Sequence, residues 1–315
     1  MKKLKQQFLE VSDALALGNP AVIEKDYWVV ALLAELEKLT FETHQLVFAG
    51  GTALAKSNVK ILRMSEDVDI KLIPSNEFDA LSRGKKKTAR KELIEQIEQT
   101  IARSQQFTIE NRLVRNEYRY VEYELKYPQQ FNQAPCLRPI IKLELMETIP
   151  LLEVEERGIQ SLVAELYKQR QEVSSFPCVS VYATLVEKVL SMLRRTMLVK
   201  RNAERKDDIT LVRHIYDVHC IDTAQALDIE SLTSLFVTVL QEDVERFGNQ
   251  HAEFVAAPSK ELRLDLQELE GNPIFRQRFA DFVTPMVFNP QPHDFDICFA
   301  SFKRIAHQLL SSIDE

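Results

Sequence analysis

The stretch LVFAGGTALAKSNVKILRMSEDVDIKLI, residues 46–73, decides how this chain is interpreted. Its first four residues, LVFA, are typical of a short buried strand, and its last seven, DVDIKLI, alternate as a half-buried strand does. The glycine pair Gly50 and Gly51 separates the first strand from a short helical segment. Because the chain has only seven glycines in 315 residues, a pair at a strand end indicates a place where the backbone approaches a ligand.

The two halves of this stretch suit the two parts of a metal-bound triphosphate. Glycines at a strand end leave backbone N–H groups directed at an anion, and the following helix adds the positive end of its dipole. Asp67 and Asp69 stand two residues apart, so their carboxylates share one strand face and can hold a hard divalent cation. Either feature alone is more often a turn or a solvated face. Their combination predicts a nucleotidyltransferase-type site.

The pattern of the whole chain predicts two domains, as its length of 315 residues permits. The N-terminal part has helical patterns at 2–17, 21–39 and 85–104 and strand patterns at 46–49, 67–73, 107–116, 118–127 and 138–147. After Pro177 the sequence favours helices at 180–199, 208–222, 228–247, 258–281 and 294–313. We therefore predict an α+β protein with a mixed-sheet domain over residues 1–175 and a helical domain over 176–315.

Composition narrows the class of protein. Hydrophobic residues make up 45% of the chain and charged residues 28%, as in folded soluble proteins. Lys and Arg number 40 against 47 Asp and Glu, which gives a net charge of −7. That balance excludes a protein that coats nucleic acid in bulk, so any RNA or DNA contact needs a local basic patch.

The cysteines and the N-terminus indicate a cytoplasmic protein. The four cysteines, at 136, 178, 220 and 298, are too far apart for a zinc or redox pattern and suggest no disulfide framework, which favours a reducing compartment. The N-terminal stretch lacks the apolar core of a signal peptide, and no run approaches the ~18 apolar residues of a membrane span. We expect no membrane contact.

The chain resembles the AbiEii/AbiGii toxin family of nucleotidyltransferases, which have a DNA polymerase β-like fold. The resemblance covers most of residues 20–220 and rests on IEKDYW (23–28), FAGGTALAK (48–56), RMSEDVDI (63–70) and EK…RHIYD (187–217). It implies transfer of a nucleotide from an NTP, with Mg²⁺, to RNA such as tRNA or to another acceptor. It also implies a toxin with a separately encoded antitoxin, in a toxin–antitoxin or abortive-infection system that acts in phage defence.

The resemblance assigns the metal carboxylates. Asp67 and Asp69 are expected to hold two Mg²⁺ ions that bridge the triphosphate and the attacking oxygen. The family fold has a third carboxylate on a neighbouring strand, for which Glu144 in IIKLEL is the candidate, either as a metal ligand or as the acceptor of the attacking group's proton. The alternative for Glu144 is a salt bridge with a neighbouring lysine or arginine, because a charge in so apolar a strand needs a partner.

Five residues near the glycine pair are candidates for binding the triphosphate. Gly50, Gly51 and Thr52 would cradle the β and γ phosphates, and Arg63 would offset developing negative charge. Ser65 would share the face of Asp67 and Asp69 if the strand already extends through it, and would then help to hold phosphate. The alternative is a serine that hydrogen-bonds the backbone at the start of the strand.

The resemblance also points to a lysine and an aspartate beyond the sheet domain. Lys188, in the EK pair, matches a family lysine thought to grip the triphosphate, and Asp217 would orient Lys188 or contact the nucleotide. The last family motif, Arg-Asp-x-x-Asp, stands here as Arg213-His214-Ile215-Tyr216-Asp217, so His214 replaces the first Asp. A surface lysine paired with a glutamate is the alternative for Lys188.

Two basic stretches suit an RNA acceptor. Six of the nine residues Arg83–Lys91 are cationic at the expected start of a helix, where the dipole disfavours cations, and Arg194–Lys206 follows the Lys188 motif. The alternative is a solvated helix start. The acceptor could also be a protein or a small molecule, or the protein could be an inactive nucleotide-binding module; the intact Asp67 and Asp69 pair argues against the last.

The segment IEKDYW holds the only tryptophan, Trp28. Its aromatic residues favour a helix that packs on the sheet. An element that closes the nucleotide pocket, or a partner surface, is the alternative.

Overall fold

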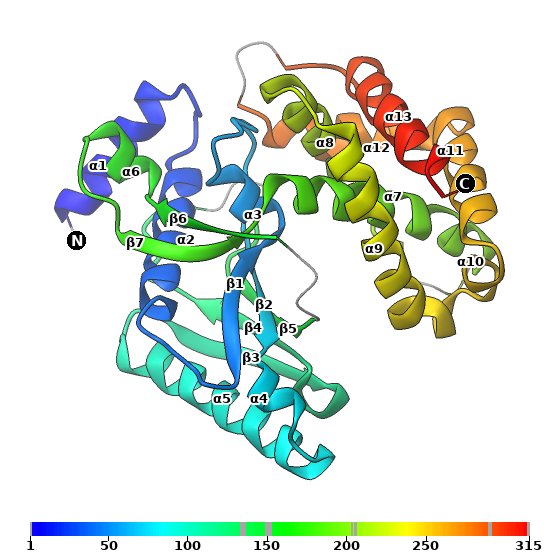
Figure 1. Ribbon diagram of the computed structural model, residues 1–315. Coiled ribbons are helices and arrows are strands. Elements are labelled where there is room, and N and C mark those ends of the chain that lie inside the picture. The colour runs from blue at the N-terminus through cyan, green and yellow to red at the C-terminus, as the bar shows by residue number, and fades with distance from the viewer. Residues whose placement is uncertain are drawn as a thin grey trace. The chain divides into compact units, whose positions relative to one another are not determined.

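The computed structural model describes residues 2–132, 137–148, 153–202, 204, 207–288 and 292–313. The chain forms two compact units, Met1–Asn58 with Met64–Ser180, and Val59–Arg63 with Val181–Glu315. We call them the sheet unit and the helical unit (Figure 1). The boundary expected after residue 175 falls inside a strand, Val173–Val179, so the sheet unit extends to Ser180, and the short segment 59–63 belongs to the helical unit.

The sheet unit contains a seven-stranded mixed sheet in the order β3-β4-β5-β2-β1-β7-β6. Its strands are β1 (His44–Ala49), β2 (Asp67–Pro74), β3 (Thr108–Arg115), β4 (Tyr120–Lys126), β5 (Ile141–Glu147), β6 (Val154–Ile159) and β7 (Val173–Val179). The β2–β5 and β1–β7 pairs are parallel, and the other pairs are antiparallel. The predicted α+β class with a mixed sheet is confirmed.

Strands β6 and β7 were not expected from the sequence. β6 is the edge strand VEERGI, whose charged and glycine residues lack a strand-like alternation, as is common where an edge faces solvent. β7, VSSFPCV, contains Pro177, which is unfavourable in the interior of a sheet. Their pairing, from Val154 opposite Val179 to Ile159 opposite Val173, depends on contacts between segments and has no local signature.

The sheet unit has the helices expected from the sequence and two short ones, at 76–79 and 162–166, that were not expected. Its helices are α1 (Lys2–Ala14), α2 (Pro20–Leu36), α3 (Gly50–Ala55), α4 (Asn76–Asp79), α5 (Arg83–Arg103) and α6 (Leu162–Leu166). Asn19 caps α2 by accepting a hydrogen bond from the N–H of Ala21 at 2.9 Å, and Pro20 occupies the first turn. A short 3₁₀ turn, Asn116–Tyr118, joins β3 to β4 with positive φ at all three residues.

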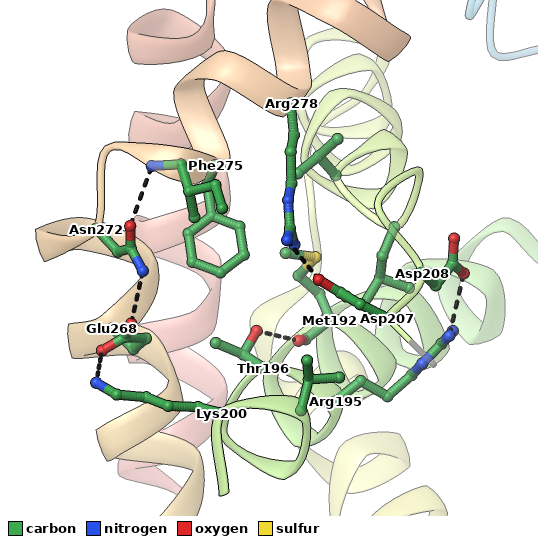
Figure 2. Close-up of a pocket in the computed structure, with 14 residues that line it drawn as sticks. Met192, Arg195, Thr196, Lys200, Asp207, Asp208, Glu268, Asn272, Phe275 and Arg278 are labelled. Carbon is green, nitrogen blue, oxygen red and sulfur yellow. Dashed lines mark hydrogen bonds and ion pairs between the residues drawn. The ribbon is translucent and has the colours of Figure 1, made fainter. Parts of the chain in front are cut away.

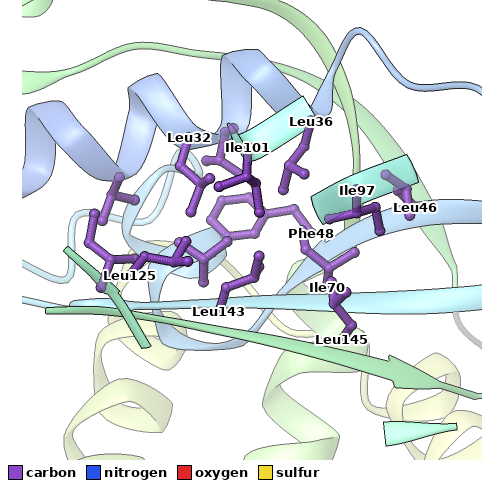
Figure 3. Close-up of a cluster of buried hydrophobic side chains, with 14 of the residues drawn as sticks. Leu32, Leu36, Leu46, Phe48, Ile70, Ile97, Ile101, Leu125, Leu143 and Leu145 are labelled. Carbon is purple, nitrogen blue, oxygen red and sulfur yellow. The ribbon is translucent and has the colours of Figure 1, made fainter. Parts of the chain in front are cut away.

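The core of the sheet unit lies on one face of the sheet, under α2 and α5. Apolar side chains of alternate strand positions meet the two helices there, with Phe48 among Leu32, Leu36, Ile70, Ile97, Ile101 and Leu143 (Figure 3). Successive residues of a strand point to opposite faces. The polar residues that alternate with this core, Asp67, Asp69, Lys142 and Glu144, therefore lie on the other face.

The helical unit contains α7 (Val181–Arg201), α8 (Arg213–Ala224), α9 (Ile229–Phe247), α10 (Ala252–Ala256), α11 (Pro258–Gly271), α12 (Ile274–Phe282) and α13 (Phe295–Ser311). The single helix expected over 258–281 is two helices, because Pro273 lacks the N–H that would continue α11. Asp228 and Asp294 cap α9 and α13 through their side chains. Within the part of the chain that the structure describes, no helix is long and apolar enough to cross a membrane.

A buried carboxyl group in the helical unit makes its stability depend on pH. Asp265 of α11 is fully buried; one oxygen accepts the N–H of Met197 at 2.7 Å, and the other has no hydrogen-bond partner among the described residues. Burial raises the pKa of Asp265 to about 8. The folded state therefore holds a proton that the unfolded state has lost, so this group's contribution falls as pH rises from about 4 through about 8.

We expect Asp265→Asn to stabilise the protein at pH 8, by about 1–3 kcal/mol, because the amide removes a buried ionisable group while keeping the acceptor for Met197. Near pH 4, where the native carboxyl is protonated, the two proteins should unfold at similar temperatures. Thermal unfolding from pH 4 to 9 measures this, with the exposed Asp281→Asn as the control for lost charge. A variant that is less stable than wild type at pH 8 would contradict the assignment.

Candidate active site

Three carboxylates lie together on the polar face of the sheet. β2 and β5 run parallel with Asp67 beside Lys142 and Asp69 beside Glu144. Residues paired in register share a face, so Asp67, Asp69 and Glu144 form a set that we call the carboxylate row. The candidate third carboxylate thus stands on the strand next to the Asp-x-Asp pair. Its partner strand could not be known from the sequence, because the two strands are separated by about seventy residues.

Two cations of the sheet unit contact this row. The Nζ of Lys142 forms an ion pair with Glu144 and a second one, at 3.0 Å, with Glu122 of β4. The Nη2 of Arg138 lies 3.1 Å from Oδ2 of Asp67. The salt bridge that was the alternative for Glu144 is therefore present, within the same set of strands that forms the row.

Gly50 permits the position of the Asp69 carboxylate. Its φ of +77° is in the left-handed region that favours glycine, and a Cβ atom there would lie 1.9 Å from Oδ2 of Asp69. Asp69 pairs with Ala49, the residue before the glycine, across the β1–β2 ladder. The first glycine of the pair is thus required by a carboxylate as well as by the turn.

Thr52 and Ser65 connect α3 to the start of β2. The hydroxyl of Thr52 donates to the carbonyl oxygen of Asp67, and its oxygen lies 2.9 Å from the hydroxyl of Ser65. Since Thr52 has one hydroxyl proton, Ser65 donates to Thr52. β2 begins at Asp67, so Ser65 lies outside the strand and does not share the face of Asp67 and Asp69 through strand alternation.

Lys25 is a fully buried cation that supports the segment before Asp67. It belongs to IEKDYW, and its Nζ donates to Glu66 at 2.5 Å and to the carbonyl oxygen of Arg138 at 2.8 Å. Burial lowers the pKa of Lys25, and the carboxylate of Glu66 opposes that shift. Sequence reasoning missed this role, although three consecutive charges within an apolar helical stripe are a signal that could have revealed it.

The neighbours of Lys25 anchor other segments of the sheet unit. Glu24 accepts hydrogen bonds from the N–H groups of Gln130 and Phe131 at 2.7 and 3.2 Å. Asp26 accepts the N–H of Leu162 at 2.7 Å and pairs with Lys56 of GGTALAK. The aromatic part of the segment packs as expected, with Trp28 against Phe107 and Tyr127. The segment IEKDYW therefore holds several other segments of the sheet unit in place.

A second set of predicted residues meets inside the helical unit. Asp217 of α8 is 0% exposed and accepts two hydrogen bonds at 2.6 Å from Nε and Nη2 of Arg63, and one ion pair at 2.7 Å from Nζ of Lys188. Burial alone raises the pKa of Asp217, but the charges of Arg63 and Lys188 outweigh it and hold that pKa far below its usual range. Burial lowers the pKa of Lys188.

The residue that departs from the family motif lies beside this set. His214 of α8 has a ring Nδ1 that is buried and has no hydrogen-bond partner among the described residues. Burial, and then the charge of Lys188, hold the pKa of His214 well below its usual value, so the ring is neutral. A neutral ring avoids a further charge beside Arg63, Lys188 and Asp217, which an aspartate at this position would add.

The second basic stretch is largely neutralised within the helical unit. Arg194 pairs with Asp243 at 2.6 Å and Arg201 with Glu261 at 2.7 Å. Figure 2 shows the pairs Arg195–Asp208 and Lys200–Glu268. Some of these pairs border a cavity of about 220 Å³ with apolar residues such as Met192 and Phe275 in its wall. Arg205 and Lys206 lie outside the described residues. The described cations of Arg194–Lys206 are therefore engaged in ion pairs within the helical unit.

The first basic stretch does not border the carboxylate row. α5 begins near the end of β2, where Lys86 pairs with Asp79, while the row is at the start of β2, roughly 20 Å away for a strand of this length (Figure 1). Arg90 is buried and bonds Glu147 at 2.5 and 2.7 Å. The side chains of Arg83, Lys85 and Lys87 are exposed.

The oxygen donors of the row fit a hard divalent cation in kind. Three carboxylates on adjacent strands are the ligands that Mg²⁺ takes, and Gly50 leaves room for the carboxylate of Asp69. Among the described residues, no group of three or more His, Cys, Asp or Glu side chains is arranged so that it could hold a metal ion. Arg138 and Lys142 hold two of the three carboxylates instead.

Comparison with known proteins agrees with this fold. Residues 31–301 match the family described as "Nucleotidyl transferase AbiEii toxin, Type IV TA system". Among solved structures the chain is similar to MenT4, a nucleotidyltransferase toxin from Mycobacterium tuberculosis H37Rv, with 17% identity, a TM-score of 0.60, and coverage of 96% of this chain and 89% of that one. A search of curated proteins gave no match.

The fold and the family match define the class of this protein as a nucleotidyltransferase. The chain belongs to the AbiEii family, and it is a nucleotidyltransferase toxin of a type IV toxin–antitoxin system. An antitoxin partner and an NTP substrate are implied by that membership.

Proposed function

We propose that this toxin transfers a nucleotide from an NTP to an RNA acceptor such as tRNA, in a reaction that depends on Mg²⁺ and releases pyrophosphate. The observation that carries the proposal is the parallel β2–β5 pairing, which sets Glu144 beside Asp69 on the face that also bears Asp67. A row of three oxygen ligands on rigid strands suits two-metal chemistry.

Asp67, Asp69 and Glu144 would hold the metal ions, which when bound neutralise the triphosphate and lower the pKa of the attacking hydroxyl. The alternative role for Glu144 is to accept the proton of the acceptor's hydroxyl instead of holding a metal ion. The backbone N–H groups of Gly51 and Thr52, in the first turn of α3, have no partner within that turn of helix and are suited to phosphate oxygens. Since the hydroxyl of Thr52 is committed to Asp67, only its backbone would serve the phosphates.

Lys188 would offset the charge of the triphosphate, and Asp217 would orient it. The 2.7 Å ion pair between them supports the orienting role, and Arg63 holds the other side of the same carboxylate. Arg63 donates both Nε and Nη2 to Asp217, which favours a positioning role over direct contact with the NTP.

An RNA acceptor is supported by the exposed cations Arg83, Lys85 and Lys87. At roughly 20 Å from the row they cannot contact a small acceptor held there, but a folded RNA spans that distance. With an RNA target the toxin would act in the cytoplasm, in agreement with the free thiols of Cys178, Cys220 and Cys298. Growth arrest by such transfer would serve phage defence by abortive infection.

The test is to incubate the protein and Mg²⁺ with each labelled NTP, total RNA and cell extract. We expect label in RNA with one NTP preferred, and pyrophosphate in equal amount. Label in protein or in a small molecule would assign another acceptor class. Absence of both label and pyrophosphate with every NTP would leave a nucleotide-binding module without catalysis.

We expect Lys85→Gln combined with Lys87→Gln to weaken RNA binding and to flatten its salt dependence by about one to two in the log–log slope, because each lysine on a phosphate releases counterions. The KM for NTP should not change. Filter binding between 50 and 200 mM salt measures the slope. Lys38→Gln with Lys126→Gln, also exposed lysines of the sheet unit, is the matched control. An unchanged slope would favour a non-nucleic-acid acceptor.

A further inference from the structure

Two cations already occupy the carboxylate row, and each of them holds a second carboxylate outside it. Arg138 contacts Asp67 through Nη2 at 3.1 Å and Glu66 through Nε at 3.1 Å. Lys142 contacts Glu144 and, at 3.0 Å, Glu122. The same arrangement therefore occurs at two separate carboxylates of the row, Asp67 and Glu144, from two different backbone positions.

The outside carboxylates are firmly held by other groups. Glu66 accepts the Nζ of Lys25 at 2.5 Å and the backbone N–H of Arg138 at 2.9 Å, and it is 5% exposed. Lys25 also binds the carbonyl oxygen of Arg138 at 2.8 Å, so the main chain of Arg138 is fixed on both sides. Glu122 accepts the hydroxyl of Tyr120 at 2.6 Å. Glu66 and Glu122 are thus fixed anchors.

The ends of the two cations that touch the row are more accessible. The side chain of Arg138 is 43% exposed, and those of Asp67 and Lys142 are 22% and 23% exposed. Leaving the row would cost Arg138 and Lys142 one ion pair each and leave neither unpaired.

We propose that Arg138 and Lys142 are built-in countercations of the carboxylate row, which a divalent metal ion displaces from Asp67 and Glu144 and which then remain paired with Glu66 and Glu122. This inference rests on the proposed metal-dependent function. Without metal, three like charges on adjacent strands would repel, and the two cations relieve that repulsion. With metal, the same cations compete for the carboxylates, so the protein folds without metal and binds it more weakly than the row alone would.

The test is direct binding of Mn²⁺, a spectroscopic substitute for Mg²⁺, by calorimetry without NTP at constant ionic strength. We expect Arg138→Gln and Lys142→Gln each to bind Mn²⁺ at least about threefold more tightly than wild type, and the double variant more tightly still, because each removes a competing ion pair of intermediate exposure. Arg138→Lys keeps the charge and should bind within about twofold of wild type.

Arg112→Gln is the matched control for lost positive charge, because Arg112 of β3 forms a 2.6 Å ion pair with Glu98 of α5, outside the row. It should leave Mn²⁺ affinity unchanged. Circular dichroism checks that each variant folds; if Arg138→Gln does not, Lys142→Gln carries the same test at the other carboxylate. Equal or weaker Mn²⁺ binding in the folded glutamine variants would overturn the inference.

The two proposals fail in distinguishable ways. If wild type binds Mn²⁺ and Asp67→Asn loses it, while the glutamine variants bind like wild type, the row is a metal site and only the countercation role is wrong. If neither wild type nor any glutamine variant binds Mn²⁺, both the countercation role and the metal role of the row are wrong. If the glutamine variants bind Mn²⁺ and wild type does not, Arg138 and Lys142 compete with the metal ion so strongly that they exclude it, which would support the countercation role.

Discussion

Asp67→Ala and Asp69→Ala are each expected to lower nucleotide transfer by at least about a thousandfold, because transfer at a metal-neutralised triphosphate needs these oxygen ligands. The fold should remain intact. Each change removes one of several like charges on the polar face, and Arg138 keeps Glu66 as a partner when Asp67 is lost.

The measurements are nucleotide incorporation and pyrophosphate release at saturating NTP, with thermal unfolding alongside. Glu110→Ala removes a strand carboxylate on β3 that pairs with Lys126, far from the row in the strand order, and should keep normal turnover. Near wild-type turnover in either aspartate variant would refute the assignment of the row.

The second large effect concerns stability. Asp217→Ala should destabilise the protein by about 3–5 kcal/mol, because it leaves the charges of Arg63 and Lys188 buried without their shared carboxylate. The folded pKa of Asp217 is depressed, so its stabilisation is fully present above the unfolded pKa, near 4, and is lost only as pH falls below that toward the folded value. The difference between wild type and variant should therefore be constant from pH 5 to 8.

Lys188→Met separates the structural role from the catalytic one. It keeps the two hydrogen bonds between Arg63 and Asp217, so urea unfolding followed by circular dichroism should show a much smaller loss than Asp217→Ala. If Lys188 also offsets the triphosphate, the variant should raise the KM for NTP, lower kcat, or do both. An Asp217→Ala protein that unfolds at the wild-type urea concentration would contradict the buried-charge argument.

The local sequence pattern was sufficient to predict much of the secondary structure of this protein. Strands at 46–49 and 67–73 are β1 and β2 within a few residues, and the helix expected over 21–39 and the short helical segment beside the glycine pair are α2 and α3. Periodicity and capping act over a few residues, so the printed sequence contains them. The single helix expected over 258–281 shows the limit, since Pro273 divides it.

The sequence by itself determined the chemical groups of the candidate site: the Asp67 and Asp69 pair, the glycines before them, and Glu144, Lys188 and Asp217 as residues worth testing. Only the tertiary structure decided which of them meet. Strand register put Glu144 beside Asp69, and helix packing closed Arg63, Lys188 and Asp217 into one buried set. The tertiary structure also decided which cations are already paired with carboxylates. Coulomb energies depend on the distance between two charges and on their burial, and neither can be read from the positions of residues in the sequence.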